Sequence, residues 1–336
     1  MQRKMYRIFS VIILFVFLGL GQRGFSSPSA VFTTSPFNAA LEADLNGVLK
    51  SEYESALSSY MGALVDSFAV SFATSDLIAD TKIKSFTIGF GVVGGITSKL
   101  TLPSSVSNDL DRGIGAGASV HLGLAGSVFS KSLEDFDFIL KLFIFPEIGS
   151  NVKFNAFSLG IKPRYHLMNG TGEGSVRWGG LTVSLSLDYS KIDLSLVDEL
   201  SGSTTFTDDN GLTATGTITS SNASTSLSLF TITPEVMTNA KLLIFKPFLA
   251  LGAVINVSSK MDIDGTINGG FTSNNGGTTG SGTLTLSGDE KAQFAIPYVR
   301  GGLAFDLWVV DLTFQGQVAL ANDTFFGGGV GLRVHF

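Results

Sequence analysis

From Ser85 to the last residue, the chain alternates apolar residues with small or polar ones, with few interruptions. The clearest run is residues 181–190, LTVSLSLDYS, where Leu, Val and Tyr alternate with Thr, Ser and Asp. A period of two is that of a β-strand with two unlike faces. The face with glycine and hydroxyl groups does not suit a globular core, because its polar groups would lack partners there. The alternation therefore predicts an all-β fold, an antiparallel transmembrane β-barrel with apolar side chains toward lipid and polar ones toward the lumen.

The composition fits such a wall. Only 15% of the residues are charged, against about 25% in ordinary soluble domains, yet no run of 18 apolar residues follows the first thirty positions. Alternating strands have this property because they raise hydropathy without any continuous apolar stretch. We expect residues 76–336 to form a barrel of roughly 10 to 14 strands, an even number.

Residues 1–30 have the organisation of a signal peptide. Their start is basic, residues 8–20 are apolar, and small residues follow up to Ala30. The apolar run is too short for a membrane-spanning helix, which needs about 20 residues. We therefore expect export, cleavage between Ser26 and Ala30, and location in the cell outer membrane. Because the chain has no cysteine, it is neither a lipoprotein nor stabilised by disulfides.

Residues 31–75 are predicted to be an amphipathic helical segment. Ser35 and Pro36 fit an N-cap followed by proline at the first helical position. Apolar residues then recur at a helical period up to Phe68, and acidic residues favour the other side. This period does not recur in the rest of the chain, so the segment is set apart from the barrel.

Charge and motifs exclude several classes of function. Removing residues 1–30 takes away four basic residues and no acidic one, so the remaining net charge is −10. An acidic chain argues against nucleic acid as a partner. Ser119 and His121 share a strand face, but no third group is suggested that would orient a catalytic pair. We therefore predict no enzyme, no catalytic residue, no metal site and no cofactor.

Two stretches, residues 199–227 and 261–290, are rich in Ser, Thr, Gly and Asn and interrupt the alternation. Barrels of this kind have short periplasmic turns and longer extracellular loops. We therefore interpret both stretches as long polar hairpins that project from the cell. Their low complexity also fits plain disorder, and the sequence leaves this alternative open.

The last twelve residues, FFGGGVGLRVHF, fix the direction of the two faces. Arg333 falls on the opposite face from Val330, Leu332, Val334 and Phe336. An arginine facing lipid would cost about 2–4 kcal/mol at the bilayer midplane. Arg333 must therefore point into the lumen, and the row ending at Phe336 must face lipid.

This ending resembles the C-terminal signature of bacterial outer-membrane barrels. The resemblance implies that the barrel-assembly machinery reads Phe336, with Val334, Leu332 and Val330 before it, as the assembly signal. The whole layout is similar to uncharacterised outer-membrane barrels with an N-terminal helix. More distantly it resembles fatty-acid and hydrocarbon transporters that carry an N-terminal plug, and surface adhesins of spirochaetes. The transporters' N-terminal Asn-Pro-Ala motif is absent, so no functional residue is carried over.

The alternation also predicts a basic lumen. The residues assigned to its inner face are Lys141, Lys162, Arg164, His166, Arg300 and Arg333. One hypothesis is that the acidic segment folds back and pairs with these cations, thereby plugging the pore. The plug residues would be Glu42, Asp44, Glu52 and Glu54. The alternative is that Asp188 and Glu147, on nearby strands, neutralise the same cations.

An apolar group, Ile139, Phe143 and Phe145, interrupts the polar inner face. It is either a patch for a hydrophobic ligand or the place where the apolar side of the helical segment packs, at Leu45, Leu49 and Tyr53. The prediction for function is a channel or transporter for small anionic or hydrophobic solutes, with outer-membrane lipid around it. The alternative is a surface adhesin that contacts host surface molecules through residues 199–227 and 261–290.

Overall fold

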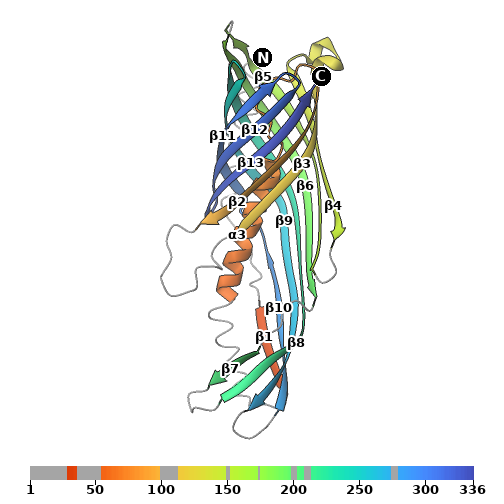
Figure 1. The fold of residues 1–336 in the computed structure, drawn as a ribbon, viewed down its shortest axis with the longest axis vertical. Coiled ribbons are helices and arrows are strands. Elements are labelled where there is room, and N and C mark those ends of the chain that lie inside the picture. Colours follow the sequence, from red (N-terminus) through yellow and green to blue (C-terminus); the bar gives the residue numbers. More distant parts are fainter. Residues whose placement is uncertain are drawn as a thin grey trace.

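Figure 1 shows the computed structural model of the protein. The structure describes residues 29–35, 54–98, 113–148, 152–172, 175–197, 203–207, 213–273 and 279–336. Residues 1–28 of the predicted signal peptide lie outside the described residues, as do residues 36–53 of the predicted helical segment.

Ten antiparallel strands form a closed ring (Figure 1). In order around the ring they are β2 (Phe86–Ser98), β3 (Ile114–Ala125), β4 (Phe136–Ile148), β5 (Val152–Thr171), β6 (Val176–Val197), β8 (Thr213–Leu242), β9 (Phe245–Ser273), β11 (Ala295–Leu307), β12 (Val310–Leu320) and β13 (Thr324–His335). The ring closes because β13 pairs with β2 over its whole length, from Thr324 opposite Ser98 to His335 opposite Thr87. The predicted all-β antiparallel barrel of 10 to 14 strands is confirmed.

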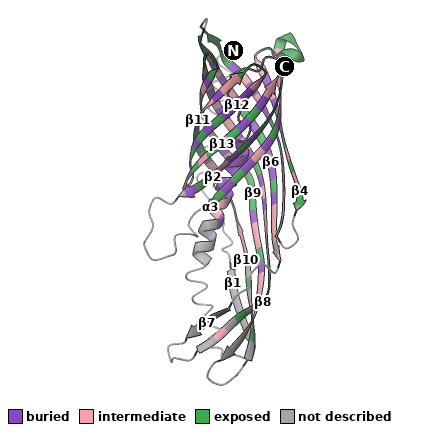
Figure 2. Ribbon diagram, viewed as in Figure 1, coloured by how far each residue is buried: buried purple, intermediate pink, exposed green. Residues whose placement is uncertain are grey.

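The two faces of the wall differ as the alternation predicts. In β13, Val330 and Leu332 are each 49% exposed on the outer face, whereas Arg333, the next residue after Leu332, is 3% exposed on the inner face. Figure 2 shows this alternation of buried and exposed positions along the strands of the ring. The pairing is incomplete at one seam, because β3 pairs with β4 only from Val120 to Ala125, so this pairing stops short of the long ends of the two strands. The apolar outer surface is the one that contact with lipid requires.

The two ends of the ring have different connections. At one end, two-residue turns at Leu243–Ile244 and Trp308–Val309 join neighbouring strands. The C-terminus lies at this same end, where the Phe336 amide donates to the carbonyl of Phe86 at 3.0 Å. We call it the short-turn end. At the opposite end, which we call the long-strand end, β8 and β9 continue well past the ring (Figure 1).

A five-stranded extension grows from the long-strand end. The strands β8 and β9, of 30 and 29 residues, carry it, and three further strands join them: β10 (Thr279–Glu290) on β9, β1 (Ser29–Ser35) on β10, and β7 (Ser203–Thr207) on β8. The predicted polar hairpin 261–290 pairs with itself as β9 and β10. For residues 199–227 the interpretation as one projecting hairpin was wrong in part, because residues 222–227 of β8 pair with β6 and continue the wall.

Helix α3 (Glu54–Ala73) begins beyond the long-strand end and runs into the ring (Figure 1). The bounds 31–75 predicted for the helical segment were wrong at their start, because residues 31–35 belong to β1. Ser35, the predicted N-cap, is the last residue of this strand, and Pro36, the predicted first helical position, lies outside the described residues. The described part of the segment is helical from Glu54 to Ala73. Within the described part of the chain, no helix is both long and apolar enough to cross a membrane.

Candidate functional site: the occupied lumen

The helix lies on a row of glycines at the inner face of β3. Gly113, Gly115 and Gly117 lie opposite the helix backbone at Ala63, Ser67 and Ser71, and a Cβ atom at any of the three would clash with it. Positions i, i+2, i+4 of a strand advance about as far as i, i+4, i+8 of a helix. The sequence can therefore place one small residue at each contact, and the helix backbone approaches the wall directly.

The other side of the helix packs on an apolar cluster. Phe143 and Phe145 of β4 pack against buried residues that include Met61 and Val65 of the helix. Ile139 lies deeper, in a cluster with Ile78 and Ile83. The three helix residues expected there, Leu45, Leu49 and Tyr53, lie outside the described residues. Because α3 and the residues that follow it cover these side chains, they are not open to a ligand in this structure.

Beyond the helix, residues 74–83 run through the lumen without helix or strand structure, beginning with a turn at residues 74–76, and we call them the lumen segment. Wall side chains donate to its carbonyls along its length: Arg300 (3.4 Å) and Gln315 (3.5 Å) to Thr74, Asn239 (2.9 Å) to Ala79 and Thr182 (2.6 Å) to Thr81. Near its end, the Ile83 amide donates to Asp137 at 2.8 Å. These bonds satisfy backbone groups that the segment, having no regular structure, cannot pair by itself.

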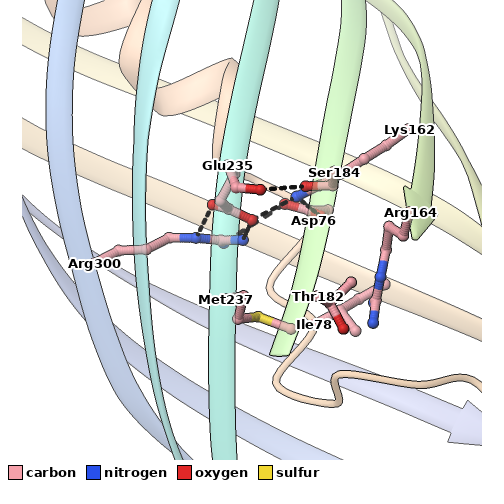
Figure 3. Close-up of a pocket in the computed structure, with 9 residues that line it drawn as sticks. All are labelled: Asp76, Ile78, Lys162, Arg164, Thr182, Ser184, Glu235, Met237 and Arg300. Atoms are coloured by element: carbon pink, nitrogen blue, oxygen red, sulfur yellow. Dashed lines mark hydrogen bonds and ion pairs between the residues drawn. The ribbon is translucent and has the colours of Figure 1, made fainter. Parts of the chain in front are cut away.

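Asp76 is the first of two carboxylates that the lumen segment carries. Figure 3 shows it between Lys162 of β5 and Arg300 of β11, with Glu235 of β8 completing the group. Lys162 Nζ lies 2.8 Å from Asp76 and 2.9 Å from Glu235, and Arg300 lies 3.6 Å from Asp76. Arg300 also donates twice to Glu235, at 2.7 and 2.8 Å, and Tyr298 donates once at 2.7 Å. All these side chains are buried. We call this group the Asp76 cluster.

Asp80 makes a second group of similar composition, which we call the Asp80 cluster. Its carboxylate lies 3.2 Å from Lys246 of β9 and also pairs with Arg333 of β13. The same two cations pair with Asp311 of β12, at 3.2 Å for Lys246, and Lys246 also lies 3.1 Å from Asp306 of β11. In both clusters the wall supplies two cations, and the lumen segment adds one aspartate to the anions of the wall.

The remaining inner charges pair within the wall. Lys141 lies 2.6 Å from Asp188, and its Nζ also lies 3.4 Å from the carbonyl of Ala73, the last residue of α3. A cation at this point is favoured by the negative end of the helix dipole. Asp137 lies 3.1 Å from His166 and 3.7 Å from Arg164.

Cations outnumber anions on the inner face of the described ring strands. The buried cations are Lys141, Lys162, Arg164, Lys246, Arg300 and Arg333, and the buried anions are Asp137, Asp188, Glu235 and Asp311. Asp306, whose side chain is 13% exposed, is a fifth wall anion and lies 3.1 Å from Lys246. With histidines neutral, six cations and five anions leave a net charge of +1, and Asp76 and Asp80 add −2. Because unpaired buried charge is costly, the pairing of four wall cations with these two aspartates stabilises the segment in the lumen.

The structure places all six basic residues predicted for the lumen inside the ring: Lys141, Lys162, Arg164, His166, Arg300 and Arg333. The four acids predicted to pair with them are not tested, because Glu42, Asp44 and Glu52 lie outside the described residues and Glu54 begins the helix with its side chain outside the description. In the described structure Asp76 and Asp80 pair with these cations. Of the two wall acids expected, Asp188 pairs with Lys141, whereas Glu147 pairs with Lys153 on the surface at 3.6 Å.

The residues of the predicted assembly signal lie in the outer face of β13 or directly after it. Val330 and Leu332 are exposed, Val334 is half-buried, and Phe336 is 73% exposed. The ring of Phe336 packs on Phe86, with their centroids 5.6 Å apart. The final aromatic therefore marks the seam where the last strand meets the first strand of the ring.

The free space of the lumen is unevenly divided. Around Asp76 and Arg300 a cavity of about 10 Å³ remains, room for about one water molecule. Toward the short-turn end there is a polar cavity of about 520 Å³, lined among others by Lys82, Arg177 and Asp306. The lumen is thus filled in its middle and open at one end.

Ser119 and His121 are both buried on the inner face of β3. The Ser119 hydroxyl and both ring nitrogens of His121 have no hydrogen-bond partner in the described structure. They are therefore not joined as a nucleophile and base would be.

Comparison with solved structures finds other barrels at low similarity. The outer membrane protease OmpT from Escherichia coli is 6% identical, with 75% of this chain and 97% of that chain covered and a TM-score of 0.35. The translocator domain of the autotransporter NalP from Neisseria meningitidis is 12% identical, with 86% of this chain and 99% of that chain covered and a TM-score of 0.30. The Pseudomonas putida toluene transporter TodX is 10% identical, with 84% of this chain and 98% of that chain covered and a TM-score of 0.26. TM-scores this low carry no conclusion about activity or substrate.

Among curated proteins, none matches this chain. A family model does match, over residues 29–336, and its description is Lsa36-like.

Proposed function

The chain belongs to the Lsa36-like family, whose model covers all the described residues, and we propose that it is an outer-membrane pore for small anions, closed in this state by its own residues 54–83. The pairing of the lumen cations is the observation that carries the proposal. Four inner cations of the ring, Lys162, Arg300, Lys246 and Arg333, pair with Asp76 and Asp80, which come from a segment that is not part of the wall.

The membrane location rests on the outer surface of the ring. Large apolar side chains are exposed on strands all around it, for example Phe90 at 46%, Leu159 at 52% and Leu251 at 53%. A water-soluble barrel would not expose such a belt, whereas lipid requires it. The predicted signal peptide and the row that ends at Phe336 support export to the outer membrane.

Anions are favoured over hydrophobic solutes because of what lines the interior. The apolar inner-face residues around Phe143 and Phe145 belong to a cluster to which α3 contributes Met61, Val65 and Phe72. The open cavity at the short-turn end is lined by six cationic side chains, Lys246 and Arg333 among them, and by two acidic ones. Movement of the lumen segment would expose Lys162 with Arg300 and Lys246 with Arg333, two pairs that attract anions.

Conductance in planar bilayers tests the proposal. The full chain should conduct little, and deletion of residues 36–83, whose described part fills the lumen and contributes no strand to the ring, should open a pore that prefers chloride to potassium. The double variant D76N/D80N keeps the chain length and should raise the fraction of time spent open. The control E147Q changes a surface pair and should behave as the unchanged protein. A deletion variant that inserts but remains silent, or that prefers cations, would contradict the proposal.

A surface adhesin is the second candidate, favoured by the extension. Five strands, rich in Ser, Thr and Gly, carry the sheet beyond the ring. Deletion of residues 262–289 removes the paired part of β9 and β10 but leaves the pairing of β9 with β11, from Phe245 to Ile255, intact. Cells that carry this variant should lose binding to host surface molecules if the extension is adhesive, and keep it if the extension only supports the ring.

A further inference from the structure

The helix crosses the ring in a defined direction. Ala63, Ser67 and Ser71 meet Gly113, Gly115 and Gly117 in the same order, so α3 runs parallel to β3. Strand β3 itself runs toward the short-turn end, because its last residue, Ala125, is followed there by the link to β4. The N-terminus of α3 therefore lies at the long-strand end and its C-terminus lies inside the lumen (Figure 1).

The chain leaves the lumen at the short-turn end. Residues 80–87 line the open cavity there together with Phe336, and β2 then begins at Phe86 and returns along the wall. Residues 54–85 thus pass through the ring from one end to the other before the first strand of the ring begins.

The start of the described chain lies at the opposite end from Phe86. Strand β1 pairs with β10 from Ser29 opposite Ser287 to Ser35 opposite Ser281. Strand β10 pairs only with the part of β9 that lies beyond the ring, residues 261–272. The pairing therefore holds β1 on the extension, outside the lumen.

In barrels of this kind the short turns face the periplasm and the long connections face the outside. We propose that the N-terminal region of the chain is threaded outward through its own barrel, so that β1 is displayed on the cell surface as part of the extension. The barrel then has a second function, the anchoring of an N-terminal arm outside the membrane. Strand β1 fastens that arm by backbone pairing, the mode by which an added strand completes a sheet edge.

The proposal rests on the membrane location and not on conduction. It also limits how the lumen can open. The lumen segment is continuous with β2 at the short-turn end, and the arm is fastened by β1 at the other. A segment held at both ends can shift sideways within the ring but cannot leave it while β1 stays paired.

The absence of cysteine from the sequence makes single-cysteine labelling on intact cells a direct test. The test variants are T33C and T34C, neighbours in β1, because adjacent strand residues point to opposite faces and the pair therefore samples both faces of the strand. The references are K153C, exposed near the long-strand end, and K84C, exposed at the short-turn end. The probe is a membrane-impermeant maleimide, applied before and after permeabilisation.

We expect K153C and at least one β1 variant to react on intact cells, and K84C to react only after permeabilisation. On intact cells the labelling of K153C and of the reactive β1 variant should exceed that of K84C at least fivefold. If the β1 variants follow K84C instead, outward threading is overturned. If K84C reacts on intact cells and K153C does not, the display is overturned as well, because the long-strand end then faces the periplasm.

A crosslink resolves the case in which neither β1 variant reacts. Thr33 and Thr283 are register partners, so T33C/T283C should form a disulfide in oxidising medium, and this places β1 on the extension even if it is covered. Absence of both the label and the crosslink overturns the proposal. Conductance is irrelevant to either readout, so a failure of the pore proposal leaves this one standing.

Discussion

The inner wall of the ring has two unlike halves. One half, formed by β2, β3 and β13, presents glycines to the helix and the lumen segment, and a Cβ atom at Gly91 or Gly115 would clash with their backbone. The other half, from β5 through β8 and β9 to β11, presents Lys162, Arg300 and Lys246, which hold the same chain through Asp76 and Asp80. One charge contact comes from the first half, where Arg333 of β13 pairs with Asp80. The first half thus fits mainly by shape and the second by electrostatics.

The difference teaches what each kind of contact can specify. Close backbone packing fixes the position and direction of α3, because only a small residue fits at each step. Charge pairs fix which part of the chain occupies the lumen, because only a segment with two acids in the right places can pair with the cations of both the Asp76 and the Asp80 cluster. A foreign segment could meet one requirement by chance, but both together select residues 54–83.

The largest effect is expected in the charged half, from Glu235→Gln. Glu235 accepts from Lys162, Arg300 and Tyr298. Removing one partner of a buried ionic group typically costs about 3–5 kcal/mol, because the opposite charges stay buried without compensation. Urea unfolding of the protein refolded in lipid vesicles should show a loss of this size. A loss below about 1 kcal/mol, as expected for the surface control E147Q, would mean that water compensates the cluster.

In the glycine half the corresponding change is Gly115→Val. The new side chain would meet the backbone of Ser67, which cannot yield without moving the helix. Overpacking typically costs about 1–3 kcal/mol, and we expect a value at the upper end together with increased conductance.

The control is Gly316→Ala on β12, where a Cβ atom meets nothing within 4 Å. It should leave both stability and current unchanged. If the two variants behave alike, the glycine row does not position the helix.

The sequence predicts the wall much better than it predicts what fills it. The side that Arg333 and Leu332 face follows from a period of two, which is a local property of the strand. That Asp76 and Asp80 hold the lumen contacts does not follow from any local pattern. Their partners lie 86 positions away in Lys162 and 253 away in Arg333, and nothing near them distinguishes them from other loop aspartates.

The glycines show the same limit. Their alternation in residues 113–117 predicts a small-residue face, but only the fold shows that a helix occupies it. One signal was available: the spacing of Ala63, Ser67 and Ser71 provides a matching row of small residues on one side of α3. A row of this kind on each of two elements indicates close packing.

A smaller effect is expected from Asp80→Asn. Its side chain is 24% exposed toward the open cavity, whereas that of Asp76 is 1% exposed. Hydrogen bonds to charged groups are worth about 1.5–3 kcal/mol when buried, and partial exposure reduces this to about 1 kcal/mol. Urea unfolding of D76N and D80N side by side should therefore rank D76N as the more destabilised. The reverse order would show that depth in the lumen does not govern the strength of the charged half.

The smallest effect is expected from Ser67→Ala, which separates size from polarity in the glycine half. The Ser67 hydroxyl donates to Ala63 of its own helix at 2.7 Å and contributes nothing to the wall. Such bonds slightly disfavour the helix, and alanine is the better helix former, so the net change should stay within about 0.5 kcal/mol. The larger substitution Ser67→Leu should destabilise the protein as strongly as Gly115→Val, because it enlarges the same contact from the helix side. If Ser67→Ala itself cost more than about 1 kcal/mol, hydrogen bonding and not shape would hold α3 on β3, and the contrast between the two halves would fail.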